Sequence, residues 1–108
     1  MISGNTTRKI RTEIRSILEG CSSFQSAWGF GSYFRGEAFK DVDILVVVDC
    51  ERDKLLFLTR QLKAEVLNLE RELGMIFDLL ILTVREFAQR PLRDMDQMVL
   101  LYRRPAVD

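Results

Sequence analysis

Residues 42–48 read Val-Asp-Ile-Leu-Val-Val-Val, and no other part of the chain constrains its architecture as strongly. β-Branched side chains dominate this run, and such side chains favour extended structure over helix. A strand that is apolar at nearly every position is typical of the centre of a sheet, where both faces are covered. Asp43 is the only charged residue in the run. We therefore predict a central β-strand that carries one acid near its start.

Further strands are predicted on both sides of this run. Residues 24–30 (Phe-Gln-Ser-Ala-Trp-Gly-Phe) lead directly into a glycine-rich segment. Residues 76–82 (Ile-Phe-Asp-Leu-Leu-Ile-Leu) form a second apolar run with a single acid, Asp78, which predicts another buried strand. Residues 98–102 are apolar enough for a last strand, although a helix from residue 94 also fits the sequence.

Two helices are predicted from apolar residues that recur every three or four positions, over residues 6–19 and 51–73. Their apolar stripes are Ile10, Ile14, Ile17 and Leu18, and Leu55, Leu58, Leu62, Val66, Leu69 and Leu73. The longer stripe is also compatible with a coiled coil, but strands on both sides favour packing on a sheet. Residues suited to begin a helix are Asn5 or Thr6, Asp49, and Thr83 for a short helix to about residue 89. Residues suited to end one are Gly20, Gly74 and Pro91.

The order of these elements predicts an α/β (α+β) fold, a small mixed β-sheet with helices packed on it. The 108 residues suffice for one domain, which we expect to span residues 1–108. No apolar run approaches the ~20 residues of a membrane span, and no signal peptide is recognisable. We therefore expect a cytoplasmic protein.

Composition narrows the classes of function. The chain is 47% hydrophobic and 30% charged with a formal net charge of zero, and this balance disfavours a long nucleic-acid duplex as partner. A nucleotide remains compatible with it. The chain has no histidine, and its two cysteines, Cys21 and Cys50, are far apart, which excludes the usual zinc sites. We expect both cysteines to be buried, free thiols.

Three acids occupy positions where an apolar strand does not favour them. Asp41 and Asp43 lie at i and i+2, so their side chains point to the same face with Cα atoms about 6.5–7 Å apart. Two acids on one face of a buried strand repel each other and are costly to desolvate, and a hard cation relieves both effects. An adjacent strand could bring Asp78 to the same cation.

Structural roles remain open for each acid taken alone. Asp41 could cap the loop after Lys40, Asp43 could pair with Arg35 or Lys40, and Asp78 could form a structural ion pair. The occurrence of all three together favours a metal site.

Gly31 and Ser32, at the end of the first strand, form a turn suited to phosphate through its backbone N–H groups and a hydroxyl. This dipeptide gains weight only from the acids that follow it.

The combined pattern resembles the polymerase β-like nucleotidyltransferases, and most closely the minimal nucleotidyltransferases (MNT). It consists of residues 30–38, Phe-Gly-Ser-Tyr-Phe-Arg-Gly-Glu-Ala, followed by residues 41–47, Asp-Val-Asp-Ile-Leu-Val-Val. The resemblance implies that Gly31 and Ser32 hold the outer phosphates of ATP or another nucleoside triphosphate, with Arg35 as a further contact. It implies that Asp41, Asp43 and Asp78 ligate two Mg²⁺ ions, and that Asp78 helps to deprotonate the acceptor hydroxyl.

Two features depart from that family. Only eight residues separate Ser32 from Asp41, fewer than in many members, and Phe34 stands where a small residue is common. Both affect the expected shape of the nucleotide pocket. Arg35 could equally be a solvated or ion-paired residue.

The resemblance implies an enzyme that transfers a nucleoside monophosphate, most simply AMP, to a hydroxyl. MNT proteins also act as antitoxins beside HEPN ribonuclease toxins, and they can silence the toxin by modifying one of its tyrosines. A binding module, or a relative that binds nucleotide without catalysis, is the alternative. We expect a HEPN-type partner or a homodimer to complete the cleft, through apolar residues of segment 94–102 unless these belong to the core.

Overall fold

The computed structural model describes residues 4–90 and 97–105. Its elements, in chain order, are α1 (Gly4–Glu19), β1 (Phe24–Phe30), α2 (Gly31–Phe34), β2 (Asp41–Val48), α3 (Arg52–Leu73), β3 (Ile76–Thr83), α4 (Val84–Ala88) and β4 (Val99–Arg103). The predicted α+β class is confirmed, and the long run at residues 42–48 lies within β2.

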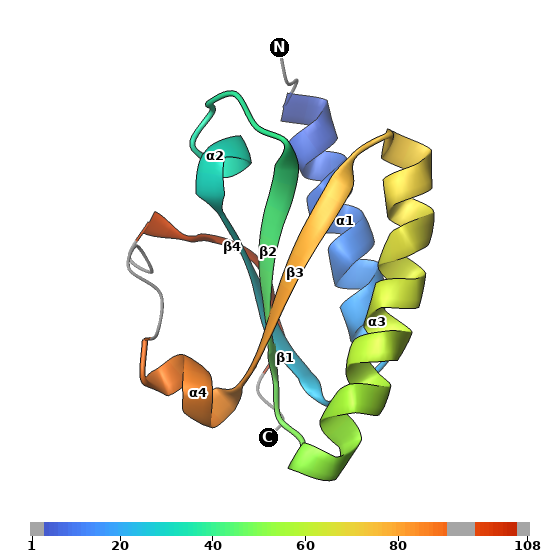
Figure 1. Cartoon of the computed structure of the whole chain (residues 1–108), viewed down its shortest axis with the longest axis vertical. Helices are drawn as coiled ribbons and strands as arrows, with labels where there is room; N and C mark the ends of the chain where they lie inside the picture. The colour runs from blue at the N-terminus through green and yellow to red at the C-terminus, as the bar shows by residue number, and fades with distance from the viewer. Residues whose placement is uncertain (1–3, 91–96, 106–108) are drawn as a thin grey trace.

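The four strands form one mixed sheet in the order β3-β2-β1-β4. β1 is antiparallel to both β2 and β4, whereas β2 and β3 are parallel because α3 returns the chain to the same end of the sheet. Helices α1 and α3 lie side by side against one face of this sheet (Figure 1). The elements of the described residues thus form two layers, and among them the opposite face carries only the short α4 at one end.

The side chains of β2 alternate between two apolar clusters. Val42, Ile44, Val46 and Val48 face the helices and belong to the main core. Leu45 and Val47 face the other way and form a smaller cluster with Leu82. Because side chains alternate along a strand, Asp41 and Asp43 point to the same face as this smaller cluster. The acids therefore lie on the sheet face that α1 and α3 leave uncovered.

The helices bury the stripes expected from their sequence spacing. The buried positions are Ile10, Ile14 and Leu18 in α1, and Leu58, Leu62, Val66 and Leu69 in α3. Each such side chain contributes about 1.5–3 kcal/mol when it leaves water, which is why these two helices dock on the sheet. Gly74, in the left-handed conformation, ends α3 as expected.

Several local predictions are wrong in detail. Asn5 and Thr6 lie inside α1, which already begins at Gly4, so neither is its N-cap. Glu51, not Asp49, is the N-cap of α3, and its side chain makes no capping hydrogen bond. Asp49 instead continues the β1–β2 pairing, since its N–H donates to the Ser23 carbonyl at 2.7 Å. This hydrogen bond to a distant residue keeps Asp49 in the strand pairing, so Asp49 does not occupy the capping position that its residue type favours.

β3 is an edge strand, not the buried strand that its apolar run predicts. It pairs only with β2, and Ile76 is 62% exposed. The side chain of Glu70 in α3 accepts a hydrogen bond from the Phe77 N–H at 2.7 Å, so this backbone group is satisfied without a neighbouring strand. The predicted cap at Thr83 is confirmed as a capping box with Glu86.

The C-terminal segment is a strand, β4, over Val99–Arg103. Residues 91–96, including Pro91 and the start of the alternative helix from residue 94, lie outside the described residues. Leu101 and Tyr102 are buried, while Leu100 is 39% exposed, so most of this strand belongs to the core.

Cys21 and Cys50 are free thiols as expected, but both are half-buried. Within the described residues the helices are too short or too polar to cross a membrane.

Arg104 links the end of β4 to the segment that connects α1 and β1. Its guanidinium donates hydrogen bonds to three backbone carbonyls, those of Phe24 at 2.8 Å, Leu18 at 2.9 Å and Cys21 at 2.6 Å. Such charge-assisted bonds hold the end of α1, the start of β1 and the end of β4 together. No local sequence pattern predicts these hydrogen bonds, because the acceptors are backbone groups about 80 residues away.

Candidate active site

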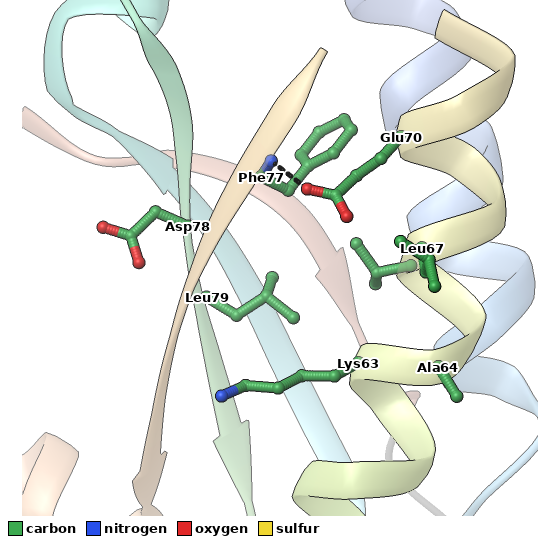
Figure 2. A pocket seen from close by; sticks show the side chains of 8 residues that line it. Lys63, Ala64, Leu67, Glu70, Phe77, Asp78 and Leu79 are labelled. Carbon is green, nitrogen blue, oxygen red and sulfur yellow. Dashed lines mark hydrogen bonds between the residues drawn. The ribbon is translucent and has the colours of Figure 1, made fainter. Parts of the chain in front are cut away.

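The parallel pairing of β2 and β3 brings two of the predicted acids together. Asp43 and Asp78 are direct partners in the register, while Asp41 pairs with Ile76. Directly opposite residues point to the same face of a sheet, and so do residues two positions apart. Asp41, Asp43 and Asp78 therefore share the uncovered face. Figure 2 shows Asp78 pointing away from α3, on the other side of β3 from Phe77 and Leu79.

Asp43 lies at the centre of this acidic group. Its pKa is raised above the ordinary value, first because burial disfavours the charged carboxylate and then because of the negative charges of Asp78 and Asp41. Arg35 acts in the opposite direction and lowers this pKa by less. Asp41 is half-buried and Asp78 is exposed. The three carboxylates are thus close enough for each of the outer two to influence the middle one.

The turn that follows β1 lies directly against Asp43. Gly31 begins the single helical turn α2 with φ of +78°, a conformation that residues with a side chain rarely adopt. A Cβ on Gly31 would overlap Oδ2 of Asp43. Glycine is required here both by the backbone conformation and by the close approach of the carboxylate. The sequence predicts a tight turn at this glycine, but it does not predict the contact with Asp43, which depends on the tertiary structure.

A cavity of about 450 Å³ joins the turn to the acids. It is lined by Ser32, Ala38, Phe39, Lys40, Asp41 and Asp43. Three of the predicted site residues, Ser32 and the first two acids, therefore meet around one space. Gly31 and Asp78 do not line this cavity, but each contacts or pairs with Asp43, which does.

Phe39 and Lys40 are cavity residues that the sequence interpretation did not assign to the site. The sequence pattern favours Lys40 only as an ion-pair partner for Asp43, and it assigns no role to Phe39. Their one signal in the sequence is position, since both immediately precede Asp41 in the loop that must connect the turn to the acids. A lysine on this wall places a positive charge beside carboxylates and a prospective phosphate group.

Arg35 lies at the rim of the site. Its Nη2 atom is 3.1 Å from Oε1 of Glu37 and 3.5 Å from Oγ of Ser32. Both Arg35 and Glu37 are exposed, so this ion pair contributes little to stability and can be exchanged for another anion. The structural role considered for this arginine and its role as a phosphate contact are therefore compatible.

Two further cavities are present, and Asp78 is the only one of the three acids that lines either of them. One of about 440 Å³ is lined by residues of α3 and β3 on the helix-covered side of the sheet (Figure 2). Another of about 730 Å³ lies at the ends of β2 and β3 remote from Asp41, near Cys50, Thr83 and Arg85. Neither brings Ser32 together with Asp41 and Asp43, so the cavity beside Asp43 is the candidate active site.

The donor set fits a hard cation in its chemistry. Carboxylate oxygens are the ligands that Mg²⁺ prefers, and Asp43 is a half-buried acid whose charge its acidic neighbours oppose. Neither Asp41 nor Asp78 has an ion-pair partner within the described residues, which weighs against purely structural roles for them. Over residues 4–90 and 97–105, however, no three or more candidate ligand side chains already converge at metal-binding distances.

Comparison with known proteins identifies the family of the chain. The family model described as a nucleotidyltransferase domain matches residues 8–107, which is nearly the whole chain. The chain therefore belongs to the nucleotidyltransferase domain family. A search of curated proteins found no match.

A solved structure supports the fold independently. It is the crystal structure of a protein from Sulfolobus solfataricus described as a nucleotidyltransferase. The match covers 90% of this chain and 79% of that one at 17% sequence identity, with a TM-score of 0.63. At this identity the similarity concerns the fold alone, the small mixed sheet with its helices.

Proposed function

We propose that this protein is a Mg²⁺-dependent nucleotidyltransferase that transfers a nucleoside monophosphate, AMP from ATP, to a hydroxyl acceptor. The observation that carries this proposal is the register that sets Asp43 beside Asp78, with Asp41 on the same face and Gly31 against the Asp43 carboxylate. Membership of the nucleotidyltransferase family supplies the class of reaction. The positions of the acids supply the residues that would perform it.

The turn and its neighbours would hold the triphosphate. Ser32 lines the cavity and offers a hydroxyl donor, and Lys40 lines it from the other end of the loop. The Nη2 atom of Arg35 is 3.5 Å from Oγ of Ser32. The guanidinium of Arg35 can therefore exchange its contact with exposed Glu37 for a contact with a phosphate oxygen. These contacts would fix the β- and γ-phosphates, and the α-phosphate would then lie toward Asp41 and Asp43.

Asp41 and Asp43 would hold two Mg²⁺ ions, and Asp78 would be a further ligand of one of them. When bound, these ions supply charge neutralisation for the phosphates and for the pyrophosphate that leaves. Asp78 would accept the proton of the acceptor hydroxyl. The acceptor oxygen forms a bond to the α-phosphorus while the bond from that phosphorus to the oxygen bridging to the β-phosphate breaks, and pyrophosphate carries away the electron pair.

The acceptor is proposed to be a hydroxyl on another molecule. Asp78 is exposed and lies on the sheet face that α1 and α3 leave uncovered, so a partner can reach it. The resemblance to MNT antitoxins suggests a tyrosine of a HEPN-type toxin as this acceptor. An antitoxin-type binding module without transfer, or a nucleotide-binding relative without catalysis, is the alternative function.

Transfer can be tested directly with the full chain. The protein is incubated with Mg²⁺, ATP labelled at the α-phosphate and the protein encoded by the neighbouring gene, and protein-bound label is measured. We expect label with wild type and with Glu65→Gln, a control that removes an exposed acid from α3. We expect none with Asp41→Asn/Asp43→Asn. Tight partner binding without label, unchanged by the double substitution, would support the binding module instead. No Mg²⁺-dependent nucleotide binding at all would exclude the enzyme.

A further inference from the structure

Three aromatic side chains pack beneath the turn that begins at Gly31. The ring of Tyr33 meets the ring of Phe34 edge to face, with centroids 4.9 Å apart and planes at 82°. It meets Phe39 in the same way, at 5.0 Å and 84°. Such edge-to-face pairs stabilise a fixed arrangement of rings. We call these three residues the aromatic brace.

The brace is anchored to helix α1. Tyr33 is only 4% exposed, and its hydroxyl is 2.8 Å from Oγ1 of Thr7, with which it shares a hydrogen bond. A buried phenol needs such a partner, because an unsatisfied polar group is costly away from water. This hydrogen bond joins residues 26 positions apart, so it connects the turn to an element outside the sheet.

The brace is also fitted to strand β1. A Cβ on Gly29 would overlap the ring of Phe34. The backbone of Gly29 does not have a positive φ, so glycine is required at this position for space and not for conformation. Phe34 thus fills the volume that a side chain of β1 would otherwise occupy. The absence of a side chain at residue 29 explains how this chain accommodates a large residue at position 34.

One member of the brace is bonded to a residue that lines the cavity, and another lines the cavity itself. Tyr33 directly follows Ser32, and Phe39 itself lines the cavity, one residue before Lys40 and two before Asp41. We propose that the aromatic brace holds the two ends of the short loop between Ser32 and Asp41 in place before nucleotide binds. Tyr33 and Phe34 are then positioning residues for the phosphate-binding turn, and Phe39 is a wall of the nucleotide site. The nucleotide part of this inference rests on the proposed function.

The brace has a direct readout in the backbone of the turn. The amides of Arg35, Gly36 and Glu37 donate to the carbonyls of Gly31, Tyr33 and Ser32, at 3.2, 3.1 and 3.0 Å. Exchange of these amides with deuterium reports how firmly the turn is held, whether or not a nucleotide is present. Binding of Mg·ATP then reports whether that order serves the nucleotide.

The first experiment removes the anchor but keeps the rings. Tyr33→Phe and Thr7→Val each delete one partner of the hydrogen bond, and Thr12→Val is the matched control at an exposed position of α1. We expect Tyr33→Phe and Thr7→Val to weaken Mg·ATP binding and to speed exchange of the three amides, each about fivefold, as expected for a lost buried hydrogen bond. The double variant should be no worse than either single one, because both act on the same bond.

The second experiment exchanges volume between β1 and the turn. Gly29→Ala places a methyl group against the Phe34 ring, and Phe34→Ala removes that ring. Each single change should speed exchange of the three amides, whereas the double variant Gly29→Ala/Phe34→Ala should recover most of the loss, because the new methyl group enters the vacated space. Phe57→Ala, at a position that is 69% exposed, is the control and should leave exchange unchanged.

The outcomes separate this inference from the proposed function. If wild type binds no Mg·ATP, the proposed function is wrong, but the exchange data still test the brace. If Tyr33→Phe and Thr7→Val leave amide exchange within about twofold of wild type, the brace does not hold the turn. If exchange speeds up while the Kd for Mg·ATP is unchanged, the brace is structural only, and its assignment as a positioning device is wrong.

Discussion

The backbone of Gly31 and the carboxylate of Asp43 are so close that a Cβ on the glycine would overlap Oδ2. The contact joins the end of β1 to the start of β2, which are also partners in the antiparallel register through Phe30 and Asp43. The turn and the acids are therefore one structural unit. Any displacement of the turn moves the central carboxylate of the site.

Gly31→Ala should disable the site, and Gly36→Ala should not. Both glycines have positive φ, at 78° and 76°, so both substitutions incur the cost of a left-handed conformation, about 1–2 kcal/mol. Only at residue 31 does the new methyl group also meet Asp43, since nothing lies within 4 Å of a Cβ at residue 36. Urea unfolding should give a larger loss of stability for Gly31→Ala, and label transfer should be lost in that variant alone. Equal transfer rates in the two variants would contradict the importance of this contact.

Asp43→Asn should stabilise the metal-free protein while it abolishes transfer. The substitution removes a partly buried charge that the carboxylates of Asp78 and Asp41 oppose, so the Tm measured in EDTA at neutral pH should rise. Transfer should fall by at least about 100-fold, because this acid is proposed as a ligand of the Mg²⁺ ions. Addition of Mg²⁺ should raise the Tm of wild type more than that of the variant. A lower Tm in EDTA would show that Asp43 has a stabilising partner.

Arg104→Met should lower stability without acting on the site. The variant keeps an apolar stem but leaves the carbonyls of Leu18, Cys21 and Phe24 without the donor that joins them. We expect the free energy of unfolding in urea to fall by about 2–4 kcal/mol. Arg103→Met is the control, since Arg103 is exposed and lies over the ring of Trp28, with its Cζ atom 5.5 Å from the ring centroid. A similar small loss in both variants would mean that the three hydrogen bonds contribute little.

Glu86 should make stability depend on pH in acid. Its pKa is lowered because its carboxylate accepts a hydrogen bond from the Thr83 backbone and because the Thr83 side chain contributes in the same direction. A lowered pKa means that the folded protein binds this proton less tightly than the unfolded chain. The stabilisation is therefore present above the ordinary value of 4.5 and is lost as the pH falls below it. Urea unfolding at several pH values should show a shallower loss in acid for Glu86→Gln than for Glu65→Gln.

The sequence was sufficient for the main elements and for the candidate acids. β2 follows from a run of β-branched residues, and the two long helices follow from their apolar stripes, because these signals are local and periodic. Asp41, Asp43 and Asp78 stood out because a charge within an apolar strand is unusual. The structure places all three on one face of the sheet.

The remaining features depend on contacts between distant parts of the chain. The pairing of Asp43 with Asp78 needs the register of two parallel strands, which no local pattern specifies. The edge position of β3 depends on strand order, and an apolar run cannot distinguish an edge from a centre when a helix covers one face. Phe34 packs against Gly29, and Arg104 donates hydrogen bonds to three carbonyls. Both are tertiary contacts, so the spacing of residues in the sequence does not predict them.

The edge strand β3 is protected against pairing with other chains at both of its ends. Glu70 accepts the hydrogen bond of the Phe77 amide, and Glu86 accepts that of the Thr83 amide. An incoming strand would have to displace two carboxylates to reach these donors, and only the few residues between them would remain for pairing. Short, acid-flanked edges of this kind resist the edge-to-edge association that leads to aggregation. The sheet can thus stay at four strands while its uncovered face remains open to a partner.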